Sequence, residues 1–501
     1  MAVLFNNIPG NIRVPLFYAE FQPGGTPYQS QARLLLVGQK LAAGSAAANE
    51  PVMVRDGSED ALFGVGSMLA AMHRIARRNA PLQEIWALPV ADLGGGVAAT
   101  GTITITGAPF AQAGVLTLYI AGERVRVGVQ TTDTNASVAT AVAAAINAMT
   151  DLPVTAAVDG VTTNEVDVTA RHKGTLGNAI MIEAGVLTED GKSPATATIV
   201  AMANGSGDPD LATAFGNLGD DEYDWIASAY ADTTNLGRAS DLLNDISGRW
   251  SYIKQIYGHY ICPHVGTVGA LSTLGNARND QHVSIFPCRR FLTPPWEVAA
   301  ALGAVAALHL QDAPELSRPL QSLELLGVKG PRAIADRLTK TDRQTLYYDG
   351  ISGYYVSRDG RVRIDRVVTT YQSNAWGDAD WTYLDIETMA QSMYGIRYIR
   401  TEVTSRHGRQ ALASSNPGLL PHIATPTDIR NTVVHAYQKL VTAEGVFENL
   451  PAFAQSLVVE RDETDANRIN VGMKLDHVNQ LRIIAAAAVN YMQLDQQRLA
   501  A

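Results

Sequence analysis

The chain has 501 residues, of which 46% are hydrophobic and 18% charged, and its formal net charge is −10. This length and composition are typical of a globular protein with more than one domain. The acidic balance argues against nucleic acid as the main partner, because duplex binding requires clustered lysine and arginine.

Residues 1–28 are predicted to form an extended N-terminal arm. They lack the basic segment and apolar core of a signal peptide, and they alternate in polarity between prolines. Apolar, strand-competent residues at a chain end need the edge of a partner sheet, and we expect a neighbouring subunit to supply it. The alternative is that the arm packs on its own chain. The candidate strand residues are Ile12, Val14 and Leu16.

Residues 29–93 and 208–340 are predicted to form an α/β host domain. Its apolar strands alternate with helices, a pattern that favours a mostly parallel sheet. The predicted strands are Arg33–Val37, Glu84–Val90, Asp224–Ala229, His259–Pro263 and His282–Pro287. The predicted helices are Met68–Arg78, Leu236–Ile256, a short one around Ala270, and Pro294–Leu310.

Residues 94–207 are predicted to form a small α+β domain inserted into the host. Glycine-rich segments at 93–96 and 204–209 bracket it, and aromatic residues are rare between them. The predicted elements are a hairpin of Val115–Ile120 and Glu123–Val129, a helix from Thr134 to Met149 capped by Asp133 or Thr134, and strands Val154–Val158 and Glu165–Ala170.

Residues 341–479 are predicted to form an α+β C-terminal domain, followed by an arm at 480–501. The predicted elements are strands Gly353–Val356 and Val362–Val368, helices Thr382–Arg400 and Pro426–Glu444, and a hairpin of Leu457–Glu460 and Arg468–Leu475. The second helix has proline at its first position after the N-cap Thr425. The arm is apolar on both faces, and its candidate strand residues are Leu481, Ile483 and Val489.

No catalytic, cofactor-binding or metal-binding residue is predicted. The segment from His264 to Val268 is faintly similar to the histidine segment of subtilisin-like proteases, but no matching serine segment follows it. Cys262 and Cys288 are too few for a disulfide framework or a zinc site, and we expect buried free thiols in a reducing compartment. The charged, aromatic block at 359–409 lacks a nucleophile–base set, which favours recognition of another protein.

Several ordered segments resemble the contractile tail sheath proteins of Mu-like bacteriophages. The similarity spans nearly the whole chain, and its matches are long and ordered. The segments are Phe63–Leu69, Ile85–Pro89, Asp359–Arg366, Tyr371-Gln372, Tyr383–Asp385, Arg397 with Arg400, Ser405–Arg409, Thr425-Pro426, Leu457–Arg461 and Asn479–Arg482.

This resemblance implies a structural virion protein that polymerises around the tail tube and contracts to drive the tube through the bacterial envelope. It also implies a non-catalytic, subtilisin-like host domain, an outward-facing inserted domain, and arms that link neighbouring subunits. The implied partners are further copies in hexameric rings, the tail tube protein, and baseplate and terminator proteins. Assembly is expected in the bacterial cytoplasm.

The resemblance further implies that the C-terminal domain contacts the tube, largely through charge. The alternative is that the basic residues of this domain, named below, pair with Glu387, Glu402 or acidic residues of a neighbouring subunit. Two other functions stay open from the residues alone: another phage structural protein, such as a tube or capsid component, and a subtilisin-like hydrolase. The candidate interface residues are Arg397, Arg400, Arg406, Arg409 and Lys439.

Overall fold

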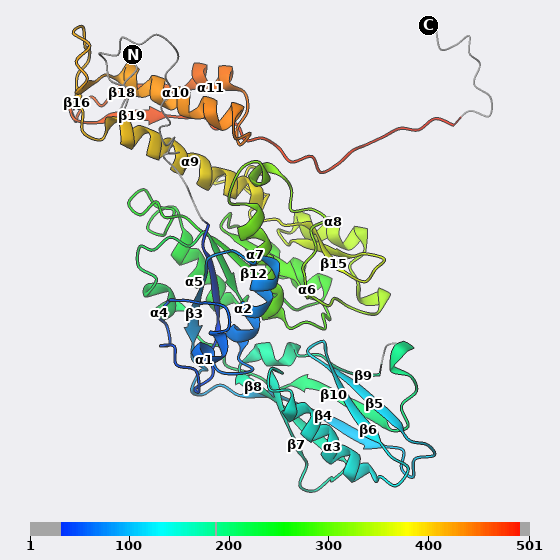
Figure 1. Ribbon diagram of the computed structural model, residues 1–501. Helices are drawn as coiled ribbons and strands as arrows, with labels where there is room; N and C mark the ends of the chain where they lie inside the picture. Colours follow the sequence, from blue (N-terminus) through cyan, green and yellow to red (C-terminus); the bar gives the residue numbers. More distant parts are fainter. Residues whose placement is uncertain (1–31, 186–187, 491–501) are drawn as a thin grey trace, which may run out of the picture. The chain divides into compact units, whose positions relative to one another are not determined.

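The computed structural model describes residues 32–185 and 188–490 (Figure 1). The chain forms two compact units. Among the described residues, the larger unit takes in 32–185, 188–395, 440–449 and 475–490, and the smaller unit takes in 396–439 and 450–474. The predicted N-terminal arm, with Ile12, Val14 and Leu16, lies outside the described residues.

A six-stranded sheet forms the centre of the larger unit, as the alternation of apolar strands and helices predicts. Its order is β13-β12-β11-β1-β3-β2, and all neighbours are parallel except β2 and β3. β1 is buried along its whole length, because helices cover a parallel sheet on both faces. The strands are β1 (Leu34–Gln39), β2 (Val52–Met53), β3 (Ile85–Val90), β11 (Trp225–Ser228), β12 (His259–His264) and β13 (Val283–Pro287).

Two helices of this unit, α2 and α7, pack against each other and against the sheet. Gly303 allows the close approach of α7, because a Cβ at this position would lie 2.7 Å from Cβ of Ala227 in β11. The helices are α1 (Glu59–Phe63), α2 (Met68–Asn79), α4 (Ala212–Gly216), α5 (Thr233–Leu243), α6 (Val268–Asn276), α7 (Pro295–His309) and α8 (Lys340–Tyr348).

Helix α5 is much shorter than the predicted span Leu236–Ile256, so that prediction was wrong. Asp232 caps its start by accepting a hydrogen bond from the Asn235 N–H. The Asn244 side chain ends it, since its Oδ1 accepts hydrogen bonds from the N–H groups of residues 246, 247 and 248. Such local side-chain bonds compete with helical ones.

The inserted domain contains two antiparallel sheets, β10-β4-β8-β7 and β6-β5-β9, and α3 packs on strands of both. Its two ends meet, because Val97 and Ser206 form an antiparallel bridge. The elements are β4 (Ala98–Thr106), β5 (Gly114–Ile120), β6 (Glu123–Val129), α3 (Asn135–Ala148), β7 (Val154–Val158), β8 (Glu165–Lys173), β9 (Ile182–Ala184) and β10 (Thr196–Ala203).

Strands β4, β9 and β10 of this domain were not predicted. The alternating Thr and Ile of residues 102–106 is a strand pattern that could have revealed β4. The cap of α3 is Thr134, within a capping box with Ser137, which decides between the two predicted caps. The predicted hairpins of β5 with β6 and β7 with β8 are present.

Helix α9 (Ile386–His407) starts later and ends later than the predicted span Thr382–Arg400. Asp385 lies before the helix and forms an ion pair with Arg366 of the hairpin β14 (Gly353–Val356) and β15 (Val362–Arg366). Because α9 continues to His407, Arg397 and Arg400 lie inside it and not in its last turn.

In the smaller unit, Thr425 is the N-cap of α10, as predicted, and it forms the reciprocal hydrogen bonds of a capping box with Asp428. Tyr437 stacks on Phe453 with ring centroids 3.6 Å apart. The further elements of the C-terminal region are β16 (Ala411–Leu412), β17 (Ile423–Ala424), α10 (Pro426–Thr442), α11 (Leu450–Ser456), and the predicted hairpin of β18 (Val458–Arg461) and β19 (Ile469–Gly472).

Candidate interaction surfaces

The candidate arginines of α9 differ widely in exposure. Arg397 is only 3% exposed and Arg400 is half-buried, so neither presents its full side chain to solvent. Arg406 in the last turn and Arg409 beyond the helix are exposed. Exposure therefore favours Arg406 and Arg409 over Arg397 as contacts for another protein.

The buried Glu402 forms ion pairs with two of the candidate basic residues of the smaller unit. Its carboxylate lies 2.9 Å from Nη2 of Arg406 and 3.3 Å from Nζ of Lys439. Although burial alone would lower the pKa of Lys439, its hydrogen bond to Glu402 contributes to a raised pKa. The alternative expected from the sequence, pairing with Glu402, is thus present for Arg406 and Lys439. Arg409 forms no ion pair with another residue that the structure describes.

Much of the charge in the block 359–409 is neutralised inside the larger unit. Arg366 forms two 2.8 Å hydrogen bonds with Asp385, and Arg361 lies 2.8 Å from Glu324. Such paired groups offer less net charge to a partner than the sequence suggests. The same block also contains two exposed aromatic residues, Trp376 and Trp381, which are 86% and 65% exposed.

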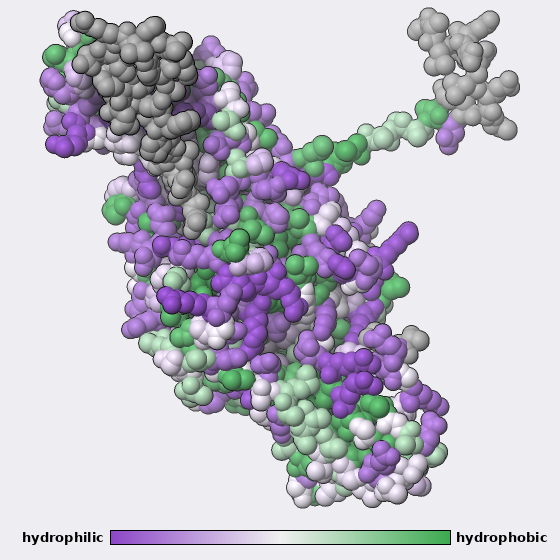
Figure 2. Space-filling model, viewed as in Figure 1, coloured by the Kyte–Doolittle hydropathy of each residue, from purple (hydrophilic) through white to green (hydrophobic). Residues whose placement is uncertain are grey.

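The segment after β19 contains no further strand up to residue 490, although His477 makes an isolated bridge with Phe447. Leu481, Ile483 and Val489 are 73%, 82% and 70% exposed. Figure 2 shows this extended segment, coloured mainly green for apolar residues. Exposed apolar side chains on backbone without sheet partners are what a strand-adding arm requires.

Within residues 481–490, Arg482 differs from its exposed neighbours, and it was not predicted as a functional residue. The Arg482 side chain is 10% exposed and lies 2.7 Å from the carboxylate of Glu387 and 3.0 Å from that of Asp385. A charged residue inside the apolar run Leu481–Val489 is the sequence signal that could have revealed it.

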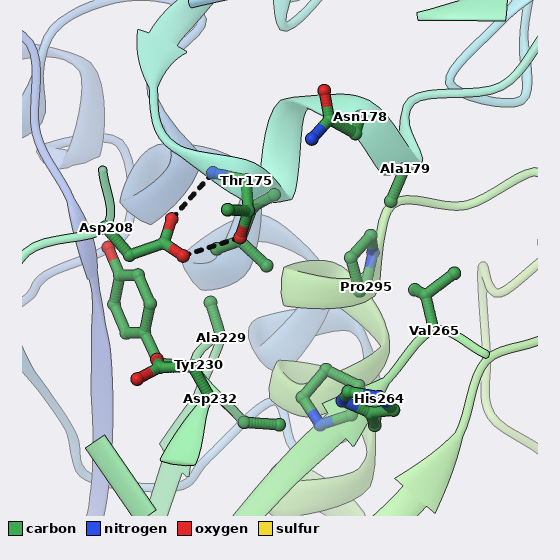
Figure 3. Close-up of a pocket in the computed structure, with 13 residues that line it drawn as sticks. Thr175, Asn178, Ala179, Asp208, Ala229, Tyr230, Asp232, His264, Val265 and Pro295 are labelled. Atoms are coloured by element: carbon green, nitrogen blue, oxygen red, sulfur yellow. Dashed lines mark hydrogen bonds between the residues drawn. The ribbon is translucent and has the colours of Figure 1, made fainter. Parts of the chain in front are cut away.

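A cavity of about 280 Å³ lies at the carboxyl ends of β11 and β12, where α/β enzymes bind their ligands. Figure 3 shows its lining, in which Thr175 of the inserted domain donates two hydrogen bonds to Asp208. Asp232 caps α5, and burial lowers the pKa of His264. No serine or cysteine is among its described lining residues, and both carboxylates hold structural bonds.

Cys262 and Cys288 are buried free thiols, as predicted, and burial raises the pKa of both well above the ordinary value. Across the described ranges, no cluster of three or more His, Cys, Asp or Glu side chains could hold a metal ion. No helix in the part of the chain that the structure describes is long and apolar enough to cross a membrane.

Comparison with known sequences gives a relative that matches nearly the full chain. The chain is 35% identical over 497 residues to the Mu-like prophage FluMu tail sheath protein of Haemophilus influenzae. The match covers 97% of this chain and 99% of the relative. Residues 204–370 also match the family model of the phage tail sheath protein central domain.

Solved structures of sheath proteins are similar at low sequence identity. The sheath tail protein of Desulfitobacterium hafniense is 12% identical with a TM-score of 0.47, over 93% of this chain and 97% of that chain. The sheath tail protein of Listeria innocua is 11% identical with a TM-score of 0.48, over 90% and 93%. A chain of the contracted helical sheath of the anti-feeding prophage is 11% identical with a TM-score of 0.44, over 97% and 99%.

Proposed function

Since the chain belongs to the family of phage tail sheath proteins, which are structural subunits of contractile tails, we propose that it polymerises around a tail tube and contracts to drive that tube through a bacterial envelope. The observation that carries this proposal is the 35% identity over 97% of the chain, because a match of that length covers nearly the whole protein and not one domain alone. The protein is then part of the virion tail, assembled in the bacterial cytoplasm.

The proposal assigns a role to each predicted domain. The host domain, 29–93 and 208–340, is a non-catalytic body of subtilisin-like fold, and the mostly parallel sheet supports this. The inserted domain, 94–207, faces outward, and its paired ends support its independence from the host sheet. The C-terminal domain, 341–479, faces the tube.

The two arms, 1–28 and 480–501, add strands to sheets of neighbouring subunits. Each main-chain hydrogen bond of such a strand contributes a net ~0.5–1.5 kcal/mol, to which burial of apolar side chains adds. The exposed Leu481, Ile483 and Val489 support this role. The subunits form stacked hexameric rings, and the arms keep them linked while the bodies repack during contraction.

The tube contact is proposed to use the exposed Arg409 and Arg406 more than the buried Arg397. Arg400 and Lys439 are half-buried, so their exposure is intermediate between that of Arg409 and that of Arg397. Lys439 also forms an ion pair with Glu402. Charge reversal at Arg409 should weaken co-sedimentation with the tube protein and leave folding unchanged. Reversal at Arg468, an exposed arginine of the β18–β19 turn, is the matched control. Unchanged co-sedimentation would remove Arg409 from the contact.

Negative-stain microscopy of the purified full chain tests the function itself. Hollow striated sleeves are expected, because sheath subunits associate with one another. Narrow tubes or closed shells would favour a tube or capsid component instead. Discrete monomers at high concentration would contradict the proposal and reopen the hydrolase reading, to be tested with peptide substrates.

A further inference from the structure

The C-terminal segment consists of two parts: the first is hydrogen-bonded to the rest of the larger unit, and the second is exposed to solvent. Residues 476–480 are fastened to the larger unit by backbone and side-chain hydrogen bonds. The Glu448 N–H donates to the Asp476 carbonyl at 2.9 Å, the Val478 N–H donates to Val446 at 3.1 Å, and Nε2 of Gln391 donates to the Val478 carbonyl at 3.0 Å. Residues 483–490 are all exposed.

Arg482 lies at the boundary between these two parts. Its Nη2 contacts both Glu387, in the first turn of α9, and Asp385, just before that helix. The Glu387 side chain is fully buried, and its other oxygen accepts the Leu320 N–H at 2.9 Å. Asp385 also binds Arg366, so two arginines and two carboxylates form a neutral cluster.

Removal of Arg482 would leave this cluster one positive charge short. A buried carboxylate without its partner is strongly unfavourable, because water no longer solvates it. Burial raises the pKa of Glu387, and the charge of Arg482 opposes that rise. Detaching residues 476–482 from α9 would therefore leave the buried Glu387 carboxylate without its partner Arg482. A bend in the chain beyond residue 482 would keep this ion pair intact.

We propose that Arg482 is the anchor of the C-terminal arm: residues 476–482 stay on their own subunit, and only the chain from Ile483 onwards engages a second copy. This rests on the proposed sheath function and places the start of the exchanged segment three residues later than the predicted arm. Arg482 is thus a positioning residue, which fixes where the arm leaves its subunit.

The next residue supports this assignment. Ile483 is one of the residues that line a cavity of about 560 Å³, together with Tyr347, Tyr348, Trp381 and Leu384. Its side chain is nevertheless 82% exposed, so little of it is buried there. The change from 10% exposure of the Arg482 side chain to this value occurs over one peptide bond.

Two truncations of the full chain test the boundary. Deletion of 484–501 keeps Arg482 and should retain the wild-type melting temperature, whereas deletion of 480–501 should melt several degrees lower. Both should fail to form sleeves. Equal melting temperatures of the two truncations, or wild-type sleeves from the shorter deletion, would overturn the proposal.

Point variants test Arg482 itself through amide hydrogen exchange in the unassembled full chain. Arg482→Ala should speed exchange at the Val478 amide at least tenfold, and Arg482→Lys should restore part of the protection, because it keeps the charge. Arg468→Ala, in the exposed β18–β19 turn, is the matched control and should leave exchange unchanged. Wild-type exchange in Arg482→Ala would contradict the anchor.

A double variant covers the case in which Arg482→Ala does not fold. Arg482→Ala with Glu387→Gln leaves no unpaired buried charge, so it should fold and still exchange fast at the Val478 amide. Slow exchange there would overturn the proposal. These readouts do not depend on assembly: if the wild-type chain forms no sleeves, the proposed function fails while the anchor is still judged by exchange.

Discussion

The host sheet and the inserted domain bury their apolar residues in different ways. Strand β1 of the host is buried at all six positions, whereas β8 of the inserted domain alternates between buried and half-buried residues along its nine. The host therefore depends on close packing of helices on both faces of its sheet. The inserted domain depends more on strand alternation and on local caps, so substitutions should have smaller and more local effects there.

The largest effect is expected where α7 packs on the host sheet. Gly303→Leu should destabilise the chain by about 3 kcal/mol, because the new side chain would overlap Ala227 and Leu34. Chemical denaturation measures this. Gly269→Ala in α6, where a Cβ meets no neighbour within 4 Å, is the control and should be neutral or slightly stabilising. Equal stability of Gly303→Leu and wild type would refute close packing at this contact.

A second prediction concerns Glu297, which lines a cavity that Arg74 of the host and Glu123 of the inserted domain also line. Burial raises the pKa of Glu297 to about 7. The folded chain then holds a proton between the ordinary value of 4.5 and pH 7 that the unfolded chain releases, so stability falls as pH rises through this window.

Glu297→Gln should remove this fall and stabilise the chain by about 2 kcal/mol above pH 7. Denaturation at several pH values measures it. Glu50→Gln, at an exposed site, is the control and should keep the wild-type pH profile. An unchanged profile in Glu297→Gln would show that another group causes the pH dependence.

The smallest effect is expected within the inserted domain. Thr134→Ala removes the side chain that caps α3 and should cost about 1 kcal/mol. Amide exchange within α3 measures it and should increase while exchange in the host sheet stays constant. Thr140→Ala, an exposed position of the same helix, is the control and should not destabilise α3. Faster exchange in both domains would mean that they unfold together.

The elements with strong periodicity were predictable from sequence. The five parallel host strands, α2, α7, the capped α3 and the capped α10 all lie close to their predicted spans, because apolar spacing and caps are local signals, whereas the two-residue strand β2 was not predicted. Helix α5 ended early because of one side chain, Asn244, whose hydrogen bonds a periodicity argument does not include.

The charged region was less predictable, since its structure depends on residues far apart in the chain. The bond from Arg482 to Glu387 joins residues 95 positions apart, and the bond from Arg366 to Asp385, just before α9, joins residues 19 positions apart. Neither pairing leaves a periodic pattern in the sequence. The candidate interface residues and domain roles stay predictions, and their tests need assembled subunits.

Both cysteines are buried, and the elevated pKa of each thiol keeps it protonated at neutral pH. Thiol-specific reagents attack the thiolate, so the folded native chain should react slowly with maleimides. A cysteine placed at an exposed arm position such as Val489 would then be the fast-reacting thiol of the molecule. Fluorescent labelling at that position could follow the arm during assembly without replacing either native cysteine.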